Sequence, residues 1–279
     1  MKVTIGIPTY NRKELLEYMA TSLYDSELLG ICNIRIYDDC STEFSKDELI
    51  TLFPNAASIN VSSNNVKADK NMFLMYKDFA STNDDYFFNA DSDFLFNKNW
   101  LEKALDLIPQ TDGVLSIFNA NSHQEKESVS DELVIKASLG AAGTFFTRER
   151  MLEVVNHFND TKDFNSFDWQ WSKYFTSRGI NLYCVSNSLM QHIGYNGQNS
   201  KYYFDVGLGY EVANQWQGQV INNVLLKSMS NIRSLQKKRQ LDFEKNHAIQ
   251  VNDFYYHFKR CMVIFLKKIL PKKIYSKLK

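Results

Sequence analysis

The sequence predicts an α/β fold in which a mostly parallel, Rossmann-like sheet is flanked by helices. In the first half of the chain, apolar runs of strand length alternate with amphipathic segments of helix length. Polar residues follow the expected ends of three strands, which is where open α/β sheets bind ligands. Hydrophobic residues make up 44% of the 279, which is enough for one large core.

Each element has its own signal. The β-branched run at 3–7 predicts a strand that ends at PTYNR, and residues 13–24 have helical spacing at Leu15, Met19 and Leu23. Strands separated by helices of this size favour parallel βαβ units with right-handed crossovers. Further strands are expected at 33–39, 58–63, 85–90 and 113–118, and further helices at 46–53, 69–80 and 99–108.

The second half is less regular. Residues 137–151 begin with small side chains and run into a strand and a helix. A helix is expected at 167–180, ending near Gly179, and a strand at 180–187. Residues 211–253 are expected to be helical, which gives the fold a C-terminal helical extension over 211–279.

The net charge of zero hides an uneven distribution. Residues 254–279 hold eight basic residues and no acid, which leaves 24 basic against 32 acidic residues in 1–253. An acidic body argues against nucleic acid as a partner. The four cysteines form no CxxC pair and no GxGxxG follows the first strand, so a zinc site and a dinucleotide-dependent oxidoreductase are disfavoured.

Two acids, Asp91 and Asp93, interrupt the aromatic run YFFNADSDFLF at 86–96. A buried carboxylate without a partner is costly. Acids two apart on an extended strand would point the same way and could together serve Mg²⁺ or Mn²⁺ bound to a diphosphate. The sequence therefore predicts a divalent metal site, and the alternative is a turn in which both acids are solvated.

The motifs VTIGIPTYNR, IYDDCS, FFNADSDFLF and FDWQWSKYF occur in the order and spacing of family 2 glycosyltransferases of the GT-A fold. This resemblance covers roughly residues 1–195. It implies inverting transfer of a sugar from a nucleotide-sugar donor, expected to be a UDP-sugar, to a hydroxyl of a glycan or lipid-linked acceptor. It also implies a glycosyltransferase domain at 1–210, with a nucleotide-binding half at about 1–97 and an acceptor half at about 98–210.

In that family the opening loop and the acids after the second strand hold the nucleotide. The pair Lys70-Asn71 matches the family's R-N pair, although the usual glycine and alanine before it are missing, and Lys67 is the alternative contact. By resemblance, the nucleotide-binding candidates are Pro8, Thr9, Tyr10, Asn11, Asp38, Asp39, Lys70, Asp91 and Ser92.

The resemblance also assigns metal ligands. Asp93 of the DSD triplet is the expected direct ligand, and Asp91 either contacts ribose or completes the shell, in part through water. His192 is the candidate third ligand, with a structural histidine as the alternative.

Asp168 stands where the family has its general base, although Phe167 replaces the acid that usually precedes the base. A first-turn acid stabilised by the helix dipole is the alternative for Asp168. Gly140 and Gly143 lie in a segment that lets backbone approach donor or acceptor, or simply packs tightly. Stacking on a sugar is open to Trp169, Trp171, Tyr195, Tyr202, Tyr203 and Trp216.

The tail at 254–279 combines aromatic residues, a short aliphatic centre and regular lysines, which is typical of a helix at a membrane surface. The alternative is a helix packed on the body with its lysines outward. We expect a cytoplasmic protein, peripheral on the inner face of the cell membrane, that acts in bacterial surface polysaccharide or glycolipid synthesis.

Two rival functions remain. A metal-dependent phosphoryl-transfer enzyme would use Asp91 as nucleophile, but Leu95 breaks the corresponding DxDx[T/V] signature. A non-catalytic, membrane-associated sugar-binding module would explain the missing glycine near Lys67 and the loss of an acid at Phe167.

Overall fold

In the computed structural model, residues 1–26, 30–195 and 205–269 are described, and for 244–269 this covers the backbone together with the side chain of Phe258. The chain divides into two compact units, Met1–Leu226 and Lys227–Lys279. The first unit holds the sheet and every described residue of the expected site.

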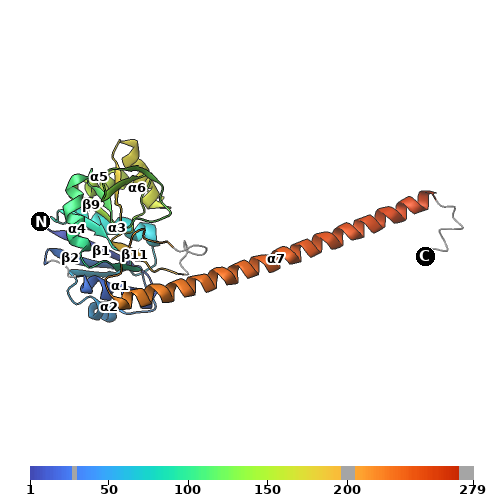
Figure 1. The fold of residues 1–279 in the computed structure, drawn as a ribbon, viewed down its shortest axis with the longest axis horizontal. Coiled ribbons are helices and arrows are strands. Elements are labelled where there is room, and N and C mark those ends of the chain that lie inside the picture. Colours follow the sequence, from blue (N-terminus) through green and yellow to red (C-terminus); the bar gives the residue numbers. More distant parts are fainter. Residues whose placement is uncertain (27–29, 196–204, 270–279) are drawn as a thin grey trace. The chain divides into compact units, whose positions relative to one another are not determined.

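A nine-stranded mixed sheet forms the centre of the first unit, with strand order β3-β2-β1-β4-β9-β6-β10-β8-β7 (Figure 1). The first four strands in this order are parallel, as the βαβ pattern predicted. The strands are β1 (Val3–Thr9), β2 (Cys32–Asp38), β3 (Ser58–Val61), β4 (Tyr86–Asn89), β6 (Val114–Ser116), β7 (Glu125–Ser128), β8 (Leu133–Lys136), β9 (Thr144–Thr147) and β10 (Leu182–Val185).

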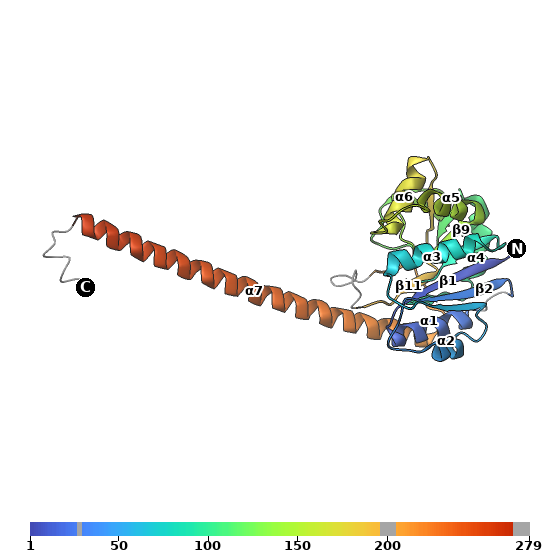
Figure 2. The ribbon, with the colours of Figure 1, turned by 180° about the vertical axis from the view of Figure 1, so that it is seen from behind.

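Helices cover both faces of this sheet (Figure 2), and α1 and α2 lie on the face opposite α3, α5 and α6. The alternation of strand side chains explains the two layers, because Phe88 and Phe145 join the core cluster of α1, α2 and α4 while Phe87 and Phe146 join that of α3, α5 and α6. The helices are α1 (Lys13–Asp25), α2 (Lys46–Leu52), α3 (Ala68–Ala80), α4 (Trp100–Leu107), α5 (Arg148–Phe158), α6 (Phe167–Ser177) and α7 (Gln215–Ile269), with a short 3₁₀ helix, η1 (Ile108–Gln110).

The parallel order ends at β4, because β9 pairs antiparallel with both β4 and β6. Aromatic cross-strand pairs account for this insertion: Phe87 lies opposite Phe146 and Phe88 opposite Phe145, whose rings stack at 4.4 Å between centroids. The sequence placed a strand near β6 but did not reveal that β9 separates it from β4.

One expectation about the two acids was wrong. Asp91 and Asp93 do not lie on an extended strand but in the tight turn between β4 and β5 (Phe94–Phe96). The chain turns there because β5 leaves the main sheet and pairs antiparallel with β11 (Met190–His192). This two-stranded sheet and the pair β7–β8 were not predicted, because strands of three or four residues carry little periodic signal.

The helical extension is confirmed as α7, which begins at Gln215 and continues as one helix to Ile269. Its first turns belong to the first unit, where Val220 and Val224 pack with Leu15, Leu95 and Ile193. Residues 270–279 of the basic tail lie outside the described residues. In the described part of the chain, no helix has the length and apolar character needed to cross a membrane.

Candidate functional site

The turn between β4 and β5 presents its acids at the carboxyl ends of the parallel strands. Asn89, the last residue of β4, pairs in register with Gly6 of β1, and Asn89 Nδ2 donates to Asp91 Oδ1 at 2.6 Å. Ser92 and Asp93 follow and are buried. The predicted donor-binding residues therefore meet at one edge of the sheet.

Asp93 is 5% exposed, and its carboxylate contacts the side chains of Arg12 and His192. Arg12 Nη1 donates to Asp93 Oδ2 at 2.7 Å, and His192 Nε2 lies 3.2 Å from the same oxygen. Gly194 lies against this pair so closely that a Cβ there would collide with both Asp93 Oδ2 and His192 Nε2. Sequence reasoning named Asp93 and His192 but missed Arg12, whose contact spans 81 residues.

The two acids have opposite protonation behaviour. Burial and the charge of Asp93 raise the pKa of Asp91 to about 7, with the Asn89 hydrogen bond opposing the rise. Burial also acts to raise the pKa of Asp93, but His192 and Arg12 outweigh it and hold that pKa well below its ordinary range. Burial lowers the pKa of His192, and the charge and hydrogen bond of Asp93 more than compensate, so that pKa is raised.

The two carboxylates fit a divalent cation. Mg²⁺ and Mn²⁺ are commonly held by one or two carboxylates, with substrate phosphates and water completing the shell, and a cation would relieve the repulsion that raises the pKa of Asp91. Among the described residues, no group of three His, Cys, Asp or Glu side chains is arranged to hold a metal. His192 Nε2 lies 3.2 Å from Asp93 Oδ2, so it could ligate a cation beside Asp93 only as an unprotonated nitrogen.

The acids after β2 hold the loops around the expected nucleotide site. Asp38 accepts hydrogen bonds from the backbone and hydroxyl of Ser41. Asp39 accepts from Val66 N at 2.6 Å and Lys67 N at 2.8 Å, which fixes the loop before α3. Both carboxylates are buried, so they shape the site through these loops.

The opening loop is tied to the same region. Asn11 Oδ1 accepts from Thr42 N at 2.8 Å, and Asn11 N donates to Ser41 Oγ at 2.8 Å. Thr9 is buried, and its hydroxyl makes no hydrogen bond to any residue in the described ranges. The exposed edge of the nucleotide candidates consists of Tyr10, Lys67 and Lys70, with Pro8 partly buried.

Strained backbone is concentrated around this edge. In the described ranges, the non-glycine residues with positive φ are Asn11, Arg12, Cys40, Lys67 and Ser166. The first four follow β1 or β2 or precede α3, and Ser166 N contacts Asp69 at the start of α3. Left-handed backbone costs a non-glycine residue roughly 1–3 kcal/mol, so five such positions at one edge are typical of a functional site.

Asp168 begins α6 and is partly buried, with Oδ1 accepting from Trp169 N at 2.8 Å. Burial raises the pKa of Asp168, its backbone hydrogen bonds oppose the rise, and the charge of Asp69 adds to it. Asp69 accepts from Phe167 N at 3.1 Å and Ser166 N at 3.3 Å. An acid from α3 therefore stands next to Asp168, where sequence reasoning saw only the loss of an acid at Phe167.

Tyr76 shows that Asp91 and Asp168 share one region. The Tyr76 side chain is fully buried, and its hydroxyl has no hydrogen-bond partner among the described residues. Burial raises the pKa of Tyr76 well above its usual value, and the charges of Asp91 and Asp168 both add to this rise. The structure thus brings the expected metal-binding acid and the expected base to the same side of α3.

The aromatic candidates for stacking on a sugar differ in their exposure and contacts. Trp171 is fully buried in the core, and Trp216 donates Nε1 to Asp25 at 3.1 Å, so both have packing roles. Tyr195 contacts Glu14 at 3.2 Å, whereas Tyr202 and Tyr203 lie outside the described residues. Trp169 is the exposed one, with 55% of its surface accessible.

The two glycines also differ. Gly143 has φ +72°, and a Cβ there would lie 2.6 Å from Met190 Sδ and 2.9 Å from Phe118 Cβ, so backbone conformation and tight packing account for it. Gly140 instead borders His123 Nε2 and Asp168 Oδ2. His123 was not singled out from the sequence, because its 45-residue separation from Asp168 hides the fact that both side chains border Gly140.

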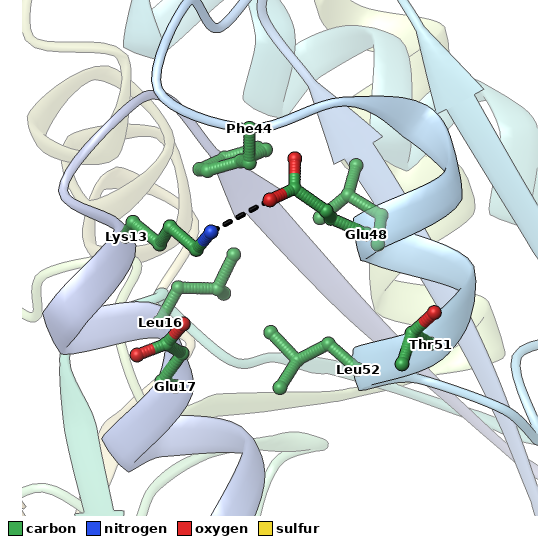
Figure 3. Close-up of a pocket in the computed structure, with 8 residues that line it drawn as sticks. Lys13, Leu16, Glu17, Phe44, Glu48, Thr51 and Leu52 are labelled. Atoms are coloured by element: carbon green, nitrogen blue, oxygen red, sulfur yellow. Dashed lines mark hydrogen bonds and ion pairs between the residues drawn. The ribbon is translucent and has the colours of Figure 1, made fainter.

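A groove of about 260 Å³ opens between α1 and α2 (Figure 3). Its walls are apolar at Leu16, Phe44 and Leu52, and Lys13 Nζ pairs with Glu48 Oε1 at 2.6 Å beside them. Both charged side chains are more than 40% exposed, so the pair contributes little stability. None of the expected site residues lines this groove, and we assign it no part in the chemistry.

Comparisons with known proteins place this geometry in a wider context. Residues 4–166 match the family model described as glycosyl transferase family 2, which is more than half of the chain. No curated protein matched the sequence.

Solved structures with a similar fold include S. aureus TarS 1-349 in complex with UDP-GlcNAc, at 15% identity and TM-score 0.51, covering 73% of this chain and 62% of that chain. Another is the mannosyltransferase PcManGT from Pyrobaculum calidifontis in complex with GDP-Man and Mn²⁺, at 15% identity and TM-score 0.50, covering 67% and 55%. Over other TarS structures the chain spans 60% and 36% of their length. At such identities the likeness shows the fold, and it confirms the GT-A type expected from the motifs.

The pKa of Asp91 gives a prediction for stability. Its ordinary value in an unfolded chain is about 4, whereas the folded value is about 7. The contribution of Asp91 to wild-type stability therefore falls as pH rises from about 4 to about 7 and changes no further above that. Asp91→Asn should raise the free energy of unfolding by an amount that is absent below pH 4, grows to pH 7 and then levels off.

Urea denaturation of the metal-free protein across this pH range measures the effect. Asp106→Asn, at an exposed acid on α4, is the matched control and should show no such pH dependence. A gain that is independent of pH, or a loss of stability at pH 8, would contradict the assignment.

Proposed function

The chain belongs to glycosyl transferase family 2, and we propose that it transfers a sugar from a nucleotide-sugar donor to a hydroxyl of a glycan or lipid-linked saccharide, with inversion at the anomeric carbon. The proposed donor is a UDP-sugar. The observation that carries this proposal is that Asp91 and Asp93 lie in the turn after β4, at the carboxyl-end edge of the sheet, and that the charges of Asp91 and Asp168 both act on the buried Tyr76. Two acids that can hold a cation and a third acid nearby are what such a displacement needs.

In this proposal the donor nucleotide binds over the loops that Asp38 and Asp39 hold. Tyr10 is 45% exposed and offers its ring to the base. Lys67 and Lys70 are exposed at the start of α3, where their charges and the helix N-terminus attract a diphosphate. Complexes of similar structures with UDP-GlcNAc and GDP-Man support this class of ligand.

Asp91 and Asp93 are the residues that would hold Mn²⁺ or Mg²⁺. When bound, the ion supplies positive charge to the departing diphosphate. The complex of one similar structure with Mn²⁺ supports the choice of a divalent metal. Arg12 Nη1 lies 2.7 Å from Asp93 Oδ2, and the Arg12 side chain is 37% exposed. Its guanidinium is therefore a second positive charge at this edge of the sheet.

Asp168 is the proposed general base. Its carboxylate removes the proton of the acceptor hydroxyl as that oxygen attacks the anomeric carbon, on the side opposite the departing diphosphate. Burial and the charge of Asp69 raise the pKa of Asp168, which makes its carboxylate a stronger proton acceptor.

A donor screen tests the proposed function. Thermal shift with a panel of nucleotide sugars, with Mn²⁺ or with EDTA, should show a stabilising shift that requires metal for at least one donor. Asp93→Ala should abolish that shift, because it removes the carboxylate that joins Arg12, His192 and the ion. Asp106→Ala is the control and should behave as wild type.

Absence of any donor shift, and of any turnover, would sink the proposed function and favour a non-catalytic module. Release of phosphate from simple esters would favour phosphoryl transfer instead.

Asp168→Asn should lower the transfer rate by about 10²- to 10⁴-fold and leave the donor-induced thermal shift intact. Asparagine keeps an oxygen for Trp169 N but cannot take a proton. Initial rates with the best donor measure the effect, with the exposed Glu149→Gln on α5 as control. Near-normal activity would remove Asp168 from the mechanism.

The C-terminal residues 254–279, with eight basic residues and no acid, are proposed to bind the inner face of the cell membrane. A lipid-linked acceptor in surface polysaccharide or glycolipid synthesis would give this contact a purpose. The full chain should cosediment with phosphatidylglycerol vesicles but not with phosphatidylcholine vesicles. Replacing Lys267, Lys268, Lys272 and Lys273 by Gln should release it, and equal binding to both lipids would refute an electrostatic contact.

A further inference from the structure

An exposed aromatic ring stands next to the proposed base. Trp169 is the third residue of α6, immediately after Asp168, and 55% of its surface is accessible. The ring of His123 lies 6.0 Å from the Trp169 ring, centroid to centroid, with 35° between the planes. An exposed indole beside the proposed base is available to contact a ligand.

His123 is fixed in place by contacts on its other side. Its Nδ1 lies 3.1 Å from Ser138 Oγ, and the buried Lys136 donates from Nζ to the His123 carbonyl at 3.2 Å. Burial lowers the pKa of His123, so the imidazole is neutral near pH 7. The ring therefore presents Nε2 as a neutral hydrogen-bonding atom.

Gly140 leaves room in front of these groups. A Cβ at Gly140 would lie 3.5 Å from His123 Nε2 and 3.9 Å from Asp168 Oδ2, and no other described atom outside the neighbouring residues comes within 4 Å of it. A small group in this space would lie within 4 Å of both the imidazole nitrogen and the carboxylate. An entering hydroxyl could therefore contact both groups.

The chemistry of the cluster selects among acceptors. A pyranose ring offers a flat C–H face for an indole and hydroxyls at its edge for a carboxylate and an imidazole. An open-chain polyol has no persistent apolar face. An anionic group would be repelled, because Asp69 and Asp168 supply negative charge here and the Lys136 ammonium is buried on the His123 carbonyl.

We infer that Trp169, His123 and Asp168 form an acceptor subsite for an uncharged pyranose, with the sugar face on Trp169 and its reacting hydroxyl between His123 Nε2 and Asp168. This inference rests on the proposed function and names its acceptor class. His123 acts as a positioning residue that orients the hydroxyl, and Asp168 receives the proton.

Saturation-transfer NMR on the full chain in the presence of UDP tests the subsite directly. The ligands are methyl β-D-glucopyranoside, methyl β-D-galactopyranoside and methyl N-acetyl-β-D-glucosaminide, with ribitol as the open-chain comparison. At least one pyranoside should receive saturation at its ring protons in wild type, and ribitol should not.

Variants then assign the contact. Trp169→Ala should weaken pyranoside binding about three- to tenfold, the range expected for one aromatic contact, and Trp169→Phe should retain most of it. His123→Ala should also weaken binding, whereas Leu74→Ala, an exposed apolar residue of α3, should not. The UDP-induced thermal shift shows that each variant is folded.

Three results would overturn the inference: no pyranoside binds wild type, binding survives Trp169→Ala, or ribitol binds with the same dependence on Trp169. These outcomes are separable from failure of the proposed function. If no nucleotide sugar is bound or turned over, the proposed function fails, and if donors bind but pyranosides do not, only the acceptor subsite fails.

Discussion

The buried carboxylate of Asp93 joins three segments that are far apart in the chain. Arg12 comes from the loop after β1, Asp93 from the turn after β4, and His192 from the end of β11. Ile193 N also donates to the Asp93 carbonyl at 2.8 Å, so backbone and side chain fix the same junction. Removing one of these partners would leave the buried Asp93 carboxylate with less compensation for its desolvation.

A second set of acids keeps the surrounding loops in strained conformations. Asp39 accepts from two backbone amides of the loop before α3, one of them on Lys67 at φ +74°. Asp69 does the same for Ser166, which has φ +53°. Because carboxylates accept backbone hydrogen bonds strongly, they can offset the cost of left-handed backbone. The acidic character of residues 1–253 is therefore partly a means of shaping loops.

The sequence predicted what depends on local pattern: the parallel strands β1 to β4, the helices between them, and Asp168 at the start of a helix. It expected Asp91 and Asp93 on an extended strand, whereas they lie in the turn after β4. It could not predict contacts set by distant pairing, such as Arg12 with Asp93 or His123 with Trp169, because neither residue type nor spacing marks them. It also treated Asp38 and Asp39 only as ligand contacts, whereas the structure gives both carboxylates backbone partners. The sequence did not predict that β9 lies between β4 and β6, because cross-strand aromatic pairs, rather than chain order, decide this position.

Asp69 connects the two halves of the site more directly than any other side chain described. It belongs to the first turn of α3, which follows the loop that Asp39 holds, and it accepts from the first amides of α6. A shift of that loop would therefore move Asp69, and Asp69 would move the start of the helix that carries Asp168. Its charge also contributes to the raised pKa of Asp168. Since Phe167 stands where the family's paired acid is expected, the second negative charge beside Asp168, the proposed base, comes from Asp69 of α3, and α3 follows the loop over which the donor is proposed to bind.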